Sequence, residues 1–267
     1  MEKGGTSEMV DDLLHITYIG GPTARIEIDG LSLLTDPTFD APGSVFRSGP
    51  VTLHKLIGPA LAPESLGPID AVLLSHDQHF DNFDRAGRIV SKNAGSVLTT
   101  PEGASRLGGN ARGLAAWQST EITNRERRIV RVTGTPARHG PPGADRGPVT
   151  GFVIAFDDSP SSAVYVSGDS VWFEGMAEVA RRFDIRTAIL FMGAARVPEI
   201  GPQHLTLAAE EGVEAARAFS QATIVPLHFE GWAHFSESRE KIAQTFASAG
   251  LAARLRWPEP GKAIRME

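Results

Sequence analysis

The residues best suited to chemistry in this chain are histidines and aspartates that directly follow apolar segments. In residues 76–82, His-Asp-Gln-His-Phe-Asp-Asn, the imidazoles of His76 and His79 are three positions apart, and the carboxylate of Asp81 follows two positions later. A tight turn of the backbone would bring these side chains together, and convergent nitrogen and oxygen donors are what a divalent cation requires. The segment therefore predicts a metal site.

Three further residues of the same kind end other apolar segments. His139 follows a predicted strand in Thr-Pro-Ala-Arg-His-Gly, Asp169 closes Tyr-Val-Ser-Gly-Asp, and His228 follows the apolar run 224–227. Any one of them alone would be interpreted as an ordinary hydrogen-bonded loop residue. Their conjunction favours a cluster of ligands around one or two cations. Because the chain contains no cysteine, such ligands must come from His, Asp or Glu.

The surrounding segments predict the elements that hold these residues. Apolar and polar residues alternate over 16–19 and 24–34 around an Asp-Gly pair, which is typical of a β-hairpin. The apolar run 69–74 is typical of a strand buried on both faces. Further strands are expected at 96–99, 128–133, 149–156, 163–166, 187–192 and 222–226, and helices at 84–92, 174–182, 206–219 and 236–248. This order favours helices that cover packed sheets, with the Gly- and Pro-rich residues 40–68 as an irregular wall of a cleft.

Composition narrows the class of protein. The 267 residues, 41% hydrophobic and 22% charged, are enough for a sizeable core, and we expect a flexible segment 1–12 followed by a single domain 13–267. The net charge of −6, without a dense Lys or Arg stripe, disfavours nucleic acid as a partner. No apolar run reaches the roughly 18 residues of a membrane span, and the polar start resembles no signal peptide, so we expect a cytoplasmic protein. Nothing in the sequence specifies an oligomeric state.

The order of the candidate ligands resembles that of the metallo-β-lactamase superfamily of metal-dependent hydrolases: a strand, a loop rich in His and Asp, a later His, a Gly-Asp pair and a final His after a strand. Ile-Thr-Tyr-Ile-Gly at 16–20 and Leu-Thr-Asp-Pro at 34–37 are similar to the branch that contains the ascorbate-phosphate lactonases and the N-acyl-phosphatidylethanolamine phospholipase D-like proteins. The resemblance covers about residues 14–257. It implies an α/β (α+β) fold, the four-layer αββα sandwich of the metallo-β-lactamase type.

The resemblance also implies which residues bind metal. The superfamily pattern is His-x-His-x-Asp-His, whereas this chain has one residue more between the histidines and has Asn82 where the third His is expected. The matching ligands are His76, His79, Asp81, His139, Asp169 and His228, with Asp169 bridging two ions. In an alternative register Asp77 takes the first position, because Asp77-x-His79-x-Asp81 keeps the family spacing. The carbonyl oxygen of Asn82 is a further candidate ligand. We expect one or two divalent ions, Zn or Mn first, with Fe, Ni or Mg as alternatives.

A bound cation would acidify water and polarise a carbonyl or phosphoryl oxygen, which predicts hydrolysis of an ester, lactone or phosphodiester bond of a small molecule. Asp81 is expected to orient the water or accept its proton. His234, just beyond the last ligand, is a candidate proton donor to the leaving group, and a position beside the next helix start explains it equally well. The candidates for the substrate pocket are Trp232, Arg138, Arg196 and His204, with salt bridges or helix capping as the simpler roles of the charged ones.

Two other classes of function fit the same fold. A metal-poor or degenerate member could act as a binding module, but the retention of six ligand-type residues argues against it. A nuclease of the same fold would need a basic surface or an added nucleic-acid-binding domain, and neither is evident in the sequence.

Overall fold

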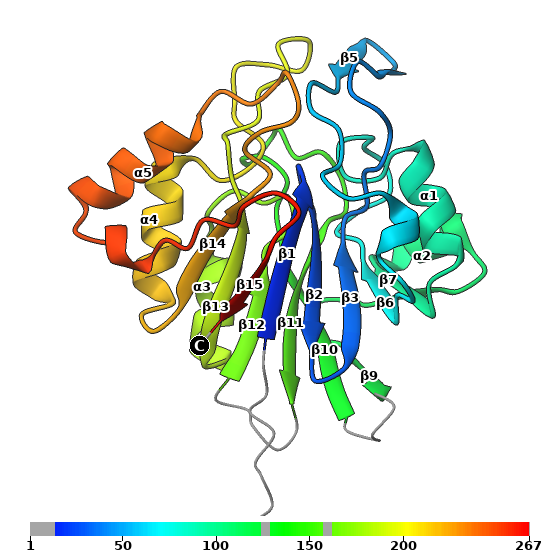
Figure 1. The fold of residues 1–267 in the computed structure, drawn as a ribbon. Helices are drawn as coiled ribbons and strands as arrows, with labels where there is room; N and C mark the ends of the chain where they lie inside the picture. Colours follow the sequence, from blue (N-terminus) through cyan, green and yellow to red (C-terminus); the bar gives the residue numbers. More distant parts are fainter. Residues whose placement is uncertain (1–13, 124–128, 157–161, 267) are drawn as a thin grey trace, which may run out of the picture.

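The structure, a computed structural model, describes residues 14–123, 129–156 and 162–266 (Figure 1). The predicted flexible segment 1–12 lies outside the described residues. Two large sheets stand face to face, one of seven strands in the order β15-β1-β2-β3-β6-β7-β8 and one of six in the order β14-β13-β12-β11-β10-β9. A separate hairpin pairs β4 with β5. We call the two large sheets the first and the second sheet.

The strands of the first sheet are β1 (Leu14–Gly20), β2 (Thr23–Ile28), β3 (Leu31–Thr35), β6 (Ala71–Leu73), β7 (Ser96–Thr99), β8 (Ala111–Gly113) and β15 (Ala263–Met266). Those of the second sheet are β9 (Ser119–Thr123), β10 (Ile129–Pro136), β11 (Thr150–Phe156), β12 (Ala163–Val166), β13 (Ile185–Phe191) and β14 (Thr223–Leu227). The hairpin is formed by β4 (Val45–Ser48) and β5 (Val51–His54). The helices are α1 (Arg85–Lys92), α2 (Pro101–Leu107), α3 (Glu174–Arg182), α4 (Ala209–Ala218) and α5 (Arg239–Ser248).

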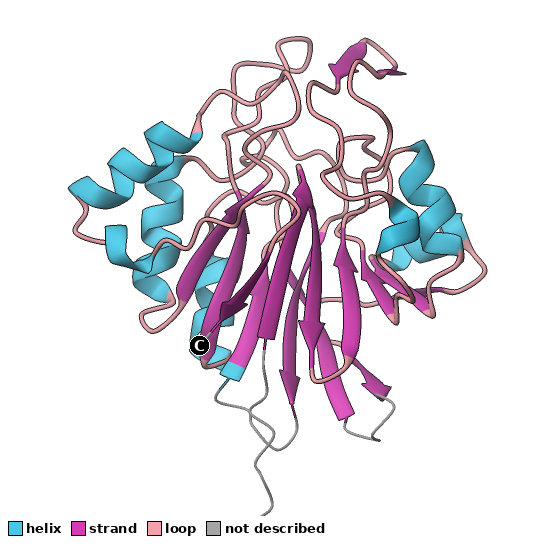
Figure 2. Ribbon diagram, in the orientation of Figure 1, coloured by secondary structure: helices cyan, strands magenta, loops and turns pink. Residues whose placement is uncertain are grey.

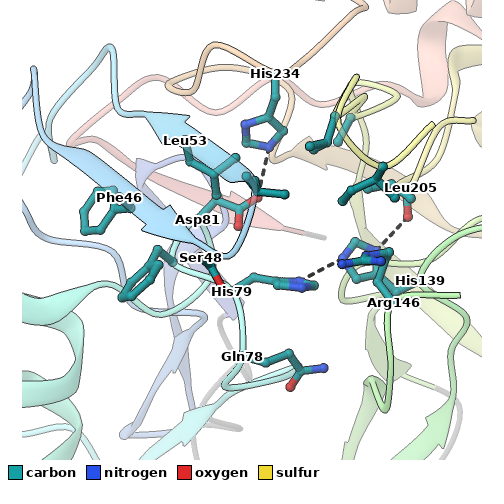
Figure 3. A pocket seen from close by; sticks show the side chains of 15 residues that line it. Phe46, Ser48, Leu53, Gln78, His79, Asp81, His139, Arg146, Leu205 and His234 are labelled. Atoms are coloured by element: carbon teal, nitrogen blue, oxygen red, sulfur yellow. Dashed lines mark hydrogen bonds and ion pairs between the residues drawn. The ribbon is translucent and has the colours of Figure 1, made fainter. Parts of the chain in front are cut away.

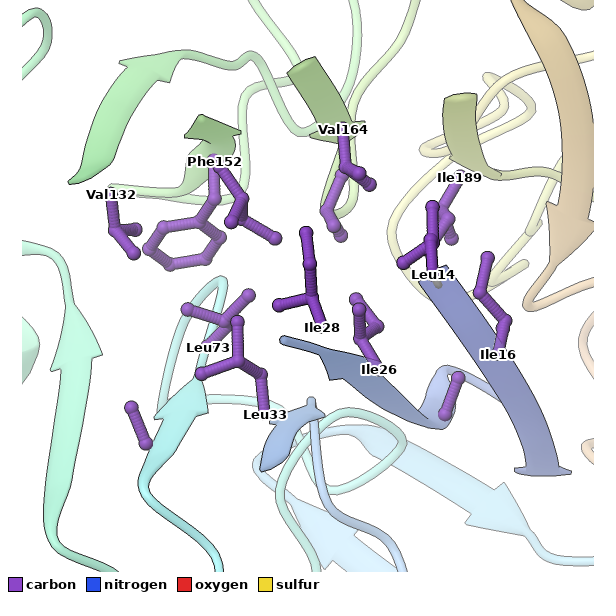
Figure 4. Close-up of a cluster of buried hydrophobic side chains, with 14 of the residues drawn as sticks. Leu14, Ile16, Ile26, Ile28, Leu33, Leu73, Val132, Phe152, Val164 and Ile189 are labelled. Carbon is purple, nitrogen blue, oxygen red and sulfur yellow. The ribbon is translucent and has the colours of Figure 1, made fainter. Parts of the chain in front are cut away.

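An apolar core fills the space between the two sheets (Figure 4). Ile26 and Leu33, which face each other across β2 and β3, come from the first sheet, and Phe152, Val164 and Ile189 come from the second. All five side chains are fully buried, as expected where every second residue of a strand points into a sandwich. The alternation over 24–34 is thus explained by one face of the hairpin packing into this core.

Helices cover the outer faces of both sheets (Figure 2), with α1 and α2 against the first sheet and α3, α4 and α5 against the second. Met176, Val213 and Phe246 of the last three helices share one buried cluster with Tyr165 of β12. The four-layer αββα sandwich predicted from the sequence is therefore confirmed. No helix in the described ranges is long and apolar enough to cross a bilayer.

Some elements differ from the sequence-based expectation. The fourth and fifth helices begin three residues later than expected, at Ala209 and Arg239, because the chain before each is extended and Ser238 caps α5. The segment expected to be irregular, 40–68, contains the hairpin of β4 and β5. The short elements α2, β8, β9 and β15 were not predicted.

The topology brings the candidate ligands to one edge of the sandwich. The strands β12, β13 and β14 are parallel, and β10 runs in the same direction as β12 because both are antiparallel to β11. The carboxyl ends of β10, β12 and β14 therefore lie at the same edge of the second sheet. At that edge the N–H of Thr150 donates to the carbonyl of Ser75, which follows β6 of the first sheet. The loops after β6, β10, β12 and β14 consequently meet.

Candidate metal centre

The loop after β6 is held by a buried aspartate of the loop after β3. The backbone N–H and the hydroxyl of Ser75 both donate to Oδ1 of Asp36, at 2.9 and 2.8 Å. Since the hydroxyl proton is used there, Ser75 Oγ accepts from Nδ1 of His76, 2.9 Å away. This bond leaves the other nitrogen of His76, Nε2, with a free lone pair. Burial raises the pKa of Asp36, against the lowering effect of its bonds from Ser75, and the nearby charges of Asp169 and Asp81 raise it further.

Three imidazoles converge in what we call the imidazole triad, His76, His79 and His139. His79 Nδ1 lies 2.8 Å from His76 Nε2 and 3.1 Å from His139 Nε2 (Figure 3 shows the latter pair). His139 Nδ1 is 2.9 Å from the carbonyl of Leu205, so it donates there, and its Nε2 also faces the triad as a lone pair. Burial lowers the pKa of His76 well below its usual value, with the charge of His79 adding to the effect. Burial and the neighbouring His139 lower the pKa of His79 to about 4.

A second group, the carboxylate triad, consists of Asp81, Asp169 and His228. His228 Nε2 lies 3.4 Å from Asp169 Oδ1 and 3.7 Å from Asp81 Oδ2. Burial would raise the pKa of both carboxyls, but interactions with the surrounding histidines, chiefly His234 for Asp81 and His228 for Asp169, outweigh it and hold both pKa values well below normal. Asp169 Oδ2 is also 3.7 Å from His139 Nε2, so this carboxylate lies between the two triads.

Local backbone geometry places the two residues that the second sheet contributes to this triad. Gly168 has a φ of +59°, and a side chain there would meet Ser75 Cβ and the carbonyl of Thr150 at 2.7 Å, which explains why a glycine precedes Asp169. His228 itself has a φ of 53°, a conformation unfavourable for any residue but glycine, and its N–H donates to the carbonyl of Gly21 at 2.9 Å. Such strain is typical of functional positions.

The donor set fits a cation. Among the described residues, Asp169 Oδ2, His228 Nε2 and Asn82 Oδ1 are buried without a hydrogen-bond partner, and buried polar atoms in folded proteins are otherwise nearly always paired. Asn82 Nδ2 donates to Asp169 Oδ1 at 3.1 Å, which leaves the amide oxygen free. Facing imidazole lone pairs and unpaired buried acceptors repel one another unless a cation lies among them.

The structure separates Asp77 from this cluster. Both carboxylate oxygens of Asp77 accept from Arg106 of α2, with Nε 2.9 Å from Oδ2 and Nη2 2.5 Å from Oδ1. Asp77 belongs to neither triad, whereas His76 occupies the first position of the imidazole triad. The ion pair with Arg106 links the ligand loop to α2.

A cavity opens onto both triads. It encloses ≈ 590 Å³, counting the part that is open to solvent. Its apolar walls come from the hairpin of β4 and β5 and from the segment 195–205, and its polar floor comes from the ligand loops; the lining residues are Phe46, Ser48, Val51, Leu53, Gln78, His79, Phe80, Asp81, His139, Arg146, Ala195, Val197, Ile200, Leu205 and His234. His234 Nε2 is 2.9 Å from Asp81 Oδ2 (Figure 3).

The four other residues expected in the substrate pocket are not among those that line this cavity. Trp232 is buried behind Phe46, with ring centroids 5.5 Å apart. The guanidinium of Arg138 stacks on Phe173, that of Arg196 donates to the carbonyl of Pro202, and His204 Nε2 lies 3.0 Å from Glu211 Oε2. The contacts of Arg196 and His204 are the simpler structural roles considered for the charged residues, whereas Arg138 Nε is buried without a hydrogen-bond partner among the described residues.

Sequence reasoning expected residues 40–68 to form a wall of a cleft, but it did not identify the individual residues that line the cavity or Arg146. Phe46 and Leu53 are isolated apolar residues in a Gly- and Pro-rich stretch, so no periodicity marks them. Arg146 lies in Gly-Pro-Pro-Gly-Ala-Asp-Arg-Gly-Pro, residues 140–148, where the proximity to His139 along the chain was the one available signal.

Comparison with known proteins agrees with this geometry. The family described as Beta-lactamase superfamily domain matches residues 32–229. A metal-dependent hydrolase of Myxococcus xanthus is 27% identical over 211 residues, covering 76% of this chain and 69% of that protein. One of an Exiguobacterium species is 26% identical over 247 residues, covering 89% and 96%. The crystal structure of an isothiocyanate hydrolase from Delia radicum gut bacteria superposes with a TM-score of 0.79 at 22% identity, covering 94% and 98% of the two chains. The chain therefore belongs to the β-lactamase superfamily domain family and is a metal-dependent hydrolase with the metallo-β-lactamase fold.

Proposed function

We propose that this protein hydrolyses an ester, lactone or phosphodiester bond of a small, largely apolar molecule. The observation that carries the proposal is the position of the cavity, whose apolar walls lead to His79 and His139 of one triad and to Asp81 of the other. A substrate held by Phe46, Val197 and similar side chains would present its polar bond to both triads.

We assign the ligands from the geometry of the two triads. The imidazole triad would hold one divalent ion, and the carboxylate triad would hold a second with help from Asn82 Oδ1. Because Nε2 of His76 faces the site and Asp77 is paired with Arg106, we place His76 in the first ligand position. Zinc suits the imidazole triad, whereas the oxygen-rich triad also suits manganese. Such an ion acidifies bound water and polarises the oxygen of the bond to be cleaved.

The protein's own side chains would handle the protons. Asp81 lies in the carboxylate triad and contacts His234 Nε2 through Oδ2, so it fixes the imidazole at the edge of the cavity. We assign Asp81 to orienting the attacking water and His234 to protonating the leaving oxygen, because His234 lines the cavity and is not a member of either triad.

The alternatives have less support. A nuclease needs a cationic surface for phosphates, but among the described residues that line the cavity Arg146 is the one arginine, and there is no lysine. A binding module without metal would leave buried carboxylates and lone pairs uncompensated. We also propose that the binding partner is a small molecule and that the protein is located in the cytoplasm.

The test begins with elemental analysis of protein purified without added metal, followed by a panel of 4-nitrophenyl butyrate, bis(4-nitrophenyl) phosphate, γ-butyrolactone and benzyl isothiocyanate. The last is included because an isothiocyanate hydrolase shares the fold. We expect one or two equivalents of Zn, Mn, Fe or Ni, and turnover of at least one of the first three probes that is lost with a chelator and in His79→Ala. Protein that contains no metal and is not stabilised by added metal would refute the proposal.

A further inference from the structure

We infer that the substrate carries an anionic group, a carboxylate, that Arg146 binds at the edge of the cavity while the scissile bond lies at the two triads. The inference deepens the proposed function, on which it rests, by naming the substrate as a small molecule with an apolar body and one negative charge. It starts from a cation that the ligand set does not use.

The guanidinium of Arg146 has no hydrogen-bond or ion-pair partner among the described residues. No carboxylate in the described ranges lies within ion-pair distance of its guanidinium, and its Nε is buried without a hydrogen-bond partner among those residues. By contrast, Arg106 binds Asp77 and Arg196 donates to a carbonyl oxygen. Arg138 also has a buried Nε without a hydrogen-bond partner in the described part of the chain, but its guanidinium stacks on Phe173 and does not line the cavity. A half-buried guanidinium is costly to desolvate unless an anion satisfies it, and its planar fork matches a carboxylate.

The loop that carries Arg146 is built to hold it in place. The backbone N–H of Arg146 donates to the carbonyl of His139 at 2.9 Å, so the backbone that carries the guanidinium is fixed to that of a candidate ligand. Gln78 Nε2, from the other ligand loop, donates to the carbonyl of Pro148 at 2.9 Å. Gly140 has a φ of +105°, and a side chain there would lie 2.6 Å from the carbonyl of Ala144, so the loop closes tightly on itself. The guanidinium is thus presented from a fixed frame, which reduces the entropy lost on binding.

Two features connect Arg146 to the reaction site. It lines the same cavity as His79 and His139, and Figure 3 shows its side chain beside those two imidazoles. The backbone N–H of Arg146 also donates to the carbonyl of His139, a member of the imidazole triad. The remainder of the wall is mainly apolar, and the described lining residues include no second arginine or lysine that would bind the anion.

The experiment compares two matched pairs of probes on the metal-loaded protein. For binding, 4-phenylbutyrate and the neutral 4-phenylbutyramide are titrated by calorimetry. For catalysis, mono-4-nitrophenyl glutarate, which ends in a carboxylate, is compared with neutral 4-nitrophenyl butyrate. We expect the wild-type protein to prefer the anionic member of each pair, and Arg146→Met to reduce that preference about 10- to 100-fold, the range for a hydrogen-bonded charge pair. Arg146→Lys, which keeps the charge without the fork, should retain part of it.

Arg47→Met is the matched control, because Arg47 lies exposed on the hairpin that forms the wall, does not line the cavity and changes the net charge equally. An equal loss of preference in Arg47→Met would mean that only the general field attracts the anion, and an unchanged preference in Arg146→Met would mean that the metal itself binds the carboxylate. Either result overturns the inference. If the wild-type protein cleaves neither ester, ester hydrolysis fails, and the calorimetric pair still decides the role of Arg146. If Arg146→Met lowers the melting temperature, Arg146→Gln replaces it.

Discussion

Replacing Lys55 with Met should lower the free energy of unfolding by about 3 kcal/mol, because it leaves the buried carboxylate of Asp84 without its cationic partner. Lys55 Nζ lies 2.9 Å from Asp84 Oδ2, and the two side chains are 3% and 0% exposed. Removing one member of such a pair costs about 3–5 kcal/mol. Asp84 keeps three backbone donors, the N–H groups of Phe39, Asp40 and Gly87 at 2.9, 2.7 and 2.8 Å, so we expect the lower end of that range. For a chain of this size the melting temperature should fall by about 6–12 °C.

The assay is urea unfolding followed by circular dichroism, with both proteins saturated with the same metal. Lys92→Met, at an exposed position in the last turn of α1, is the control and should change stability by about 0.5 kcal/mol or less. In the double variant with Asp84→Asn, the loss should be smaller than the sum of the single losses, since no charge is left unpaired. If Lys55→Met unfolds within about 1 kcal/mol of the wild type, water reaches the pair and the reasoning from burial is wrong.

The same substitution should weaken substrate binding as well. The backbone N–H of Lys55 donates to the carbonyl of Ser44, and its ammonium lies 5.4 Å from the centroid of Trp232, which packs on Phe46. The pair with Asp84 therefore fixes the hairpin of β4 and β5 against the start of α1. We expect KM for an apolar ester to rise more than kcat falls in Lys55→Met, because the hairpin forms the wall of the cavity and supplies no ligand.

Four further predictions follow from the site. Chelation should lower the melting temperature and added metal should restore it; a melting curve indifferent to both would contradict the metal centre. His76→Ala should lose bound metal by elemental analysis, whereas Asp77→Asn should keep it, and the reverse would establish the alternative register. Phe46→Ala should raise KM for an apolar ester about 10-fold through lost apolar contact, with little change for a shorter ester. The hydrogen bond that His204 donates to the carboxylate of Glu211 raises the pKa of His204, so His204 stabilises the fold fully below about pH 6.5 and loses this effect as the pH rises through its folded pKa. His204→Gln should therefore lose more stability in urea melts at about pH 6 than at about pH 8.5, and an equal loss at both would sink this assignment.

The sequence predicts the sandwich well because its inner strands carry a strong signal. The alternation over 24–34 and the apolar runs at 69–74 and 187–192 reflect burial between layers. In the structure the first range forms β2 and β3, and the two runs contain β6 and most of β13. Elements near the edges carry little signal. The strand β15 has one fully buried residue, Met266, and α2 buries only Gly103, so neither shows a periodic apolar face. The Thr-Pro pair at 100–101 does mark the start of α2, but so short a helix is easily missed.

For the site, the sequence identified the residues that the structure brings together in the two triads, but not the individual side chains that line the pocket. His76, His79 and Asp81 stand out because they cluster directly after one apolar run and because their order along the chain resembles a family. Pocket residues are ordinary hydrophobic side chains, and their role depends on which distant segments pack together. Proximity to His139 in the sequence suggested Arg138 as a pocket residue. The side chain of Arg138 stacks on Phe173, whereas that of Arg146, seven positions after His139, reaches the cavity.

Each triad draws its members from both sheets. His76, His79 and Asp81 follow β6 of the first sheet, whereas His139, Asp169 and His228 follow strands of the second. The distances between the candidate ligands consequently depend on the relative position of the two sheets. A change deep in the core between them, such as Phe152→Leu, would shift that setting by a fraction of an ångström without touching the cavity. Side-chain packing in the core between the two sheets should therefore affect the affinity of this protein for metal.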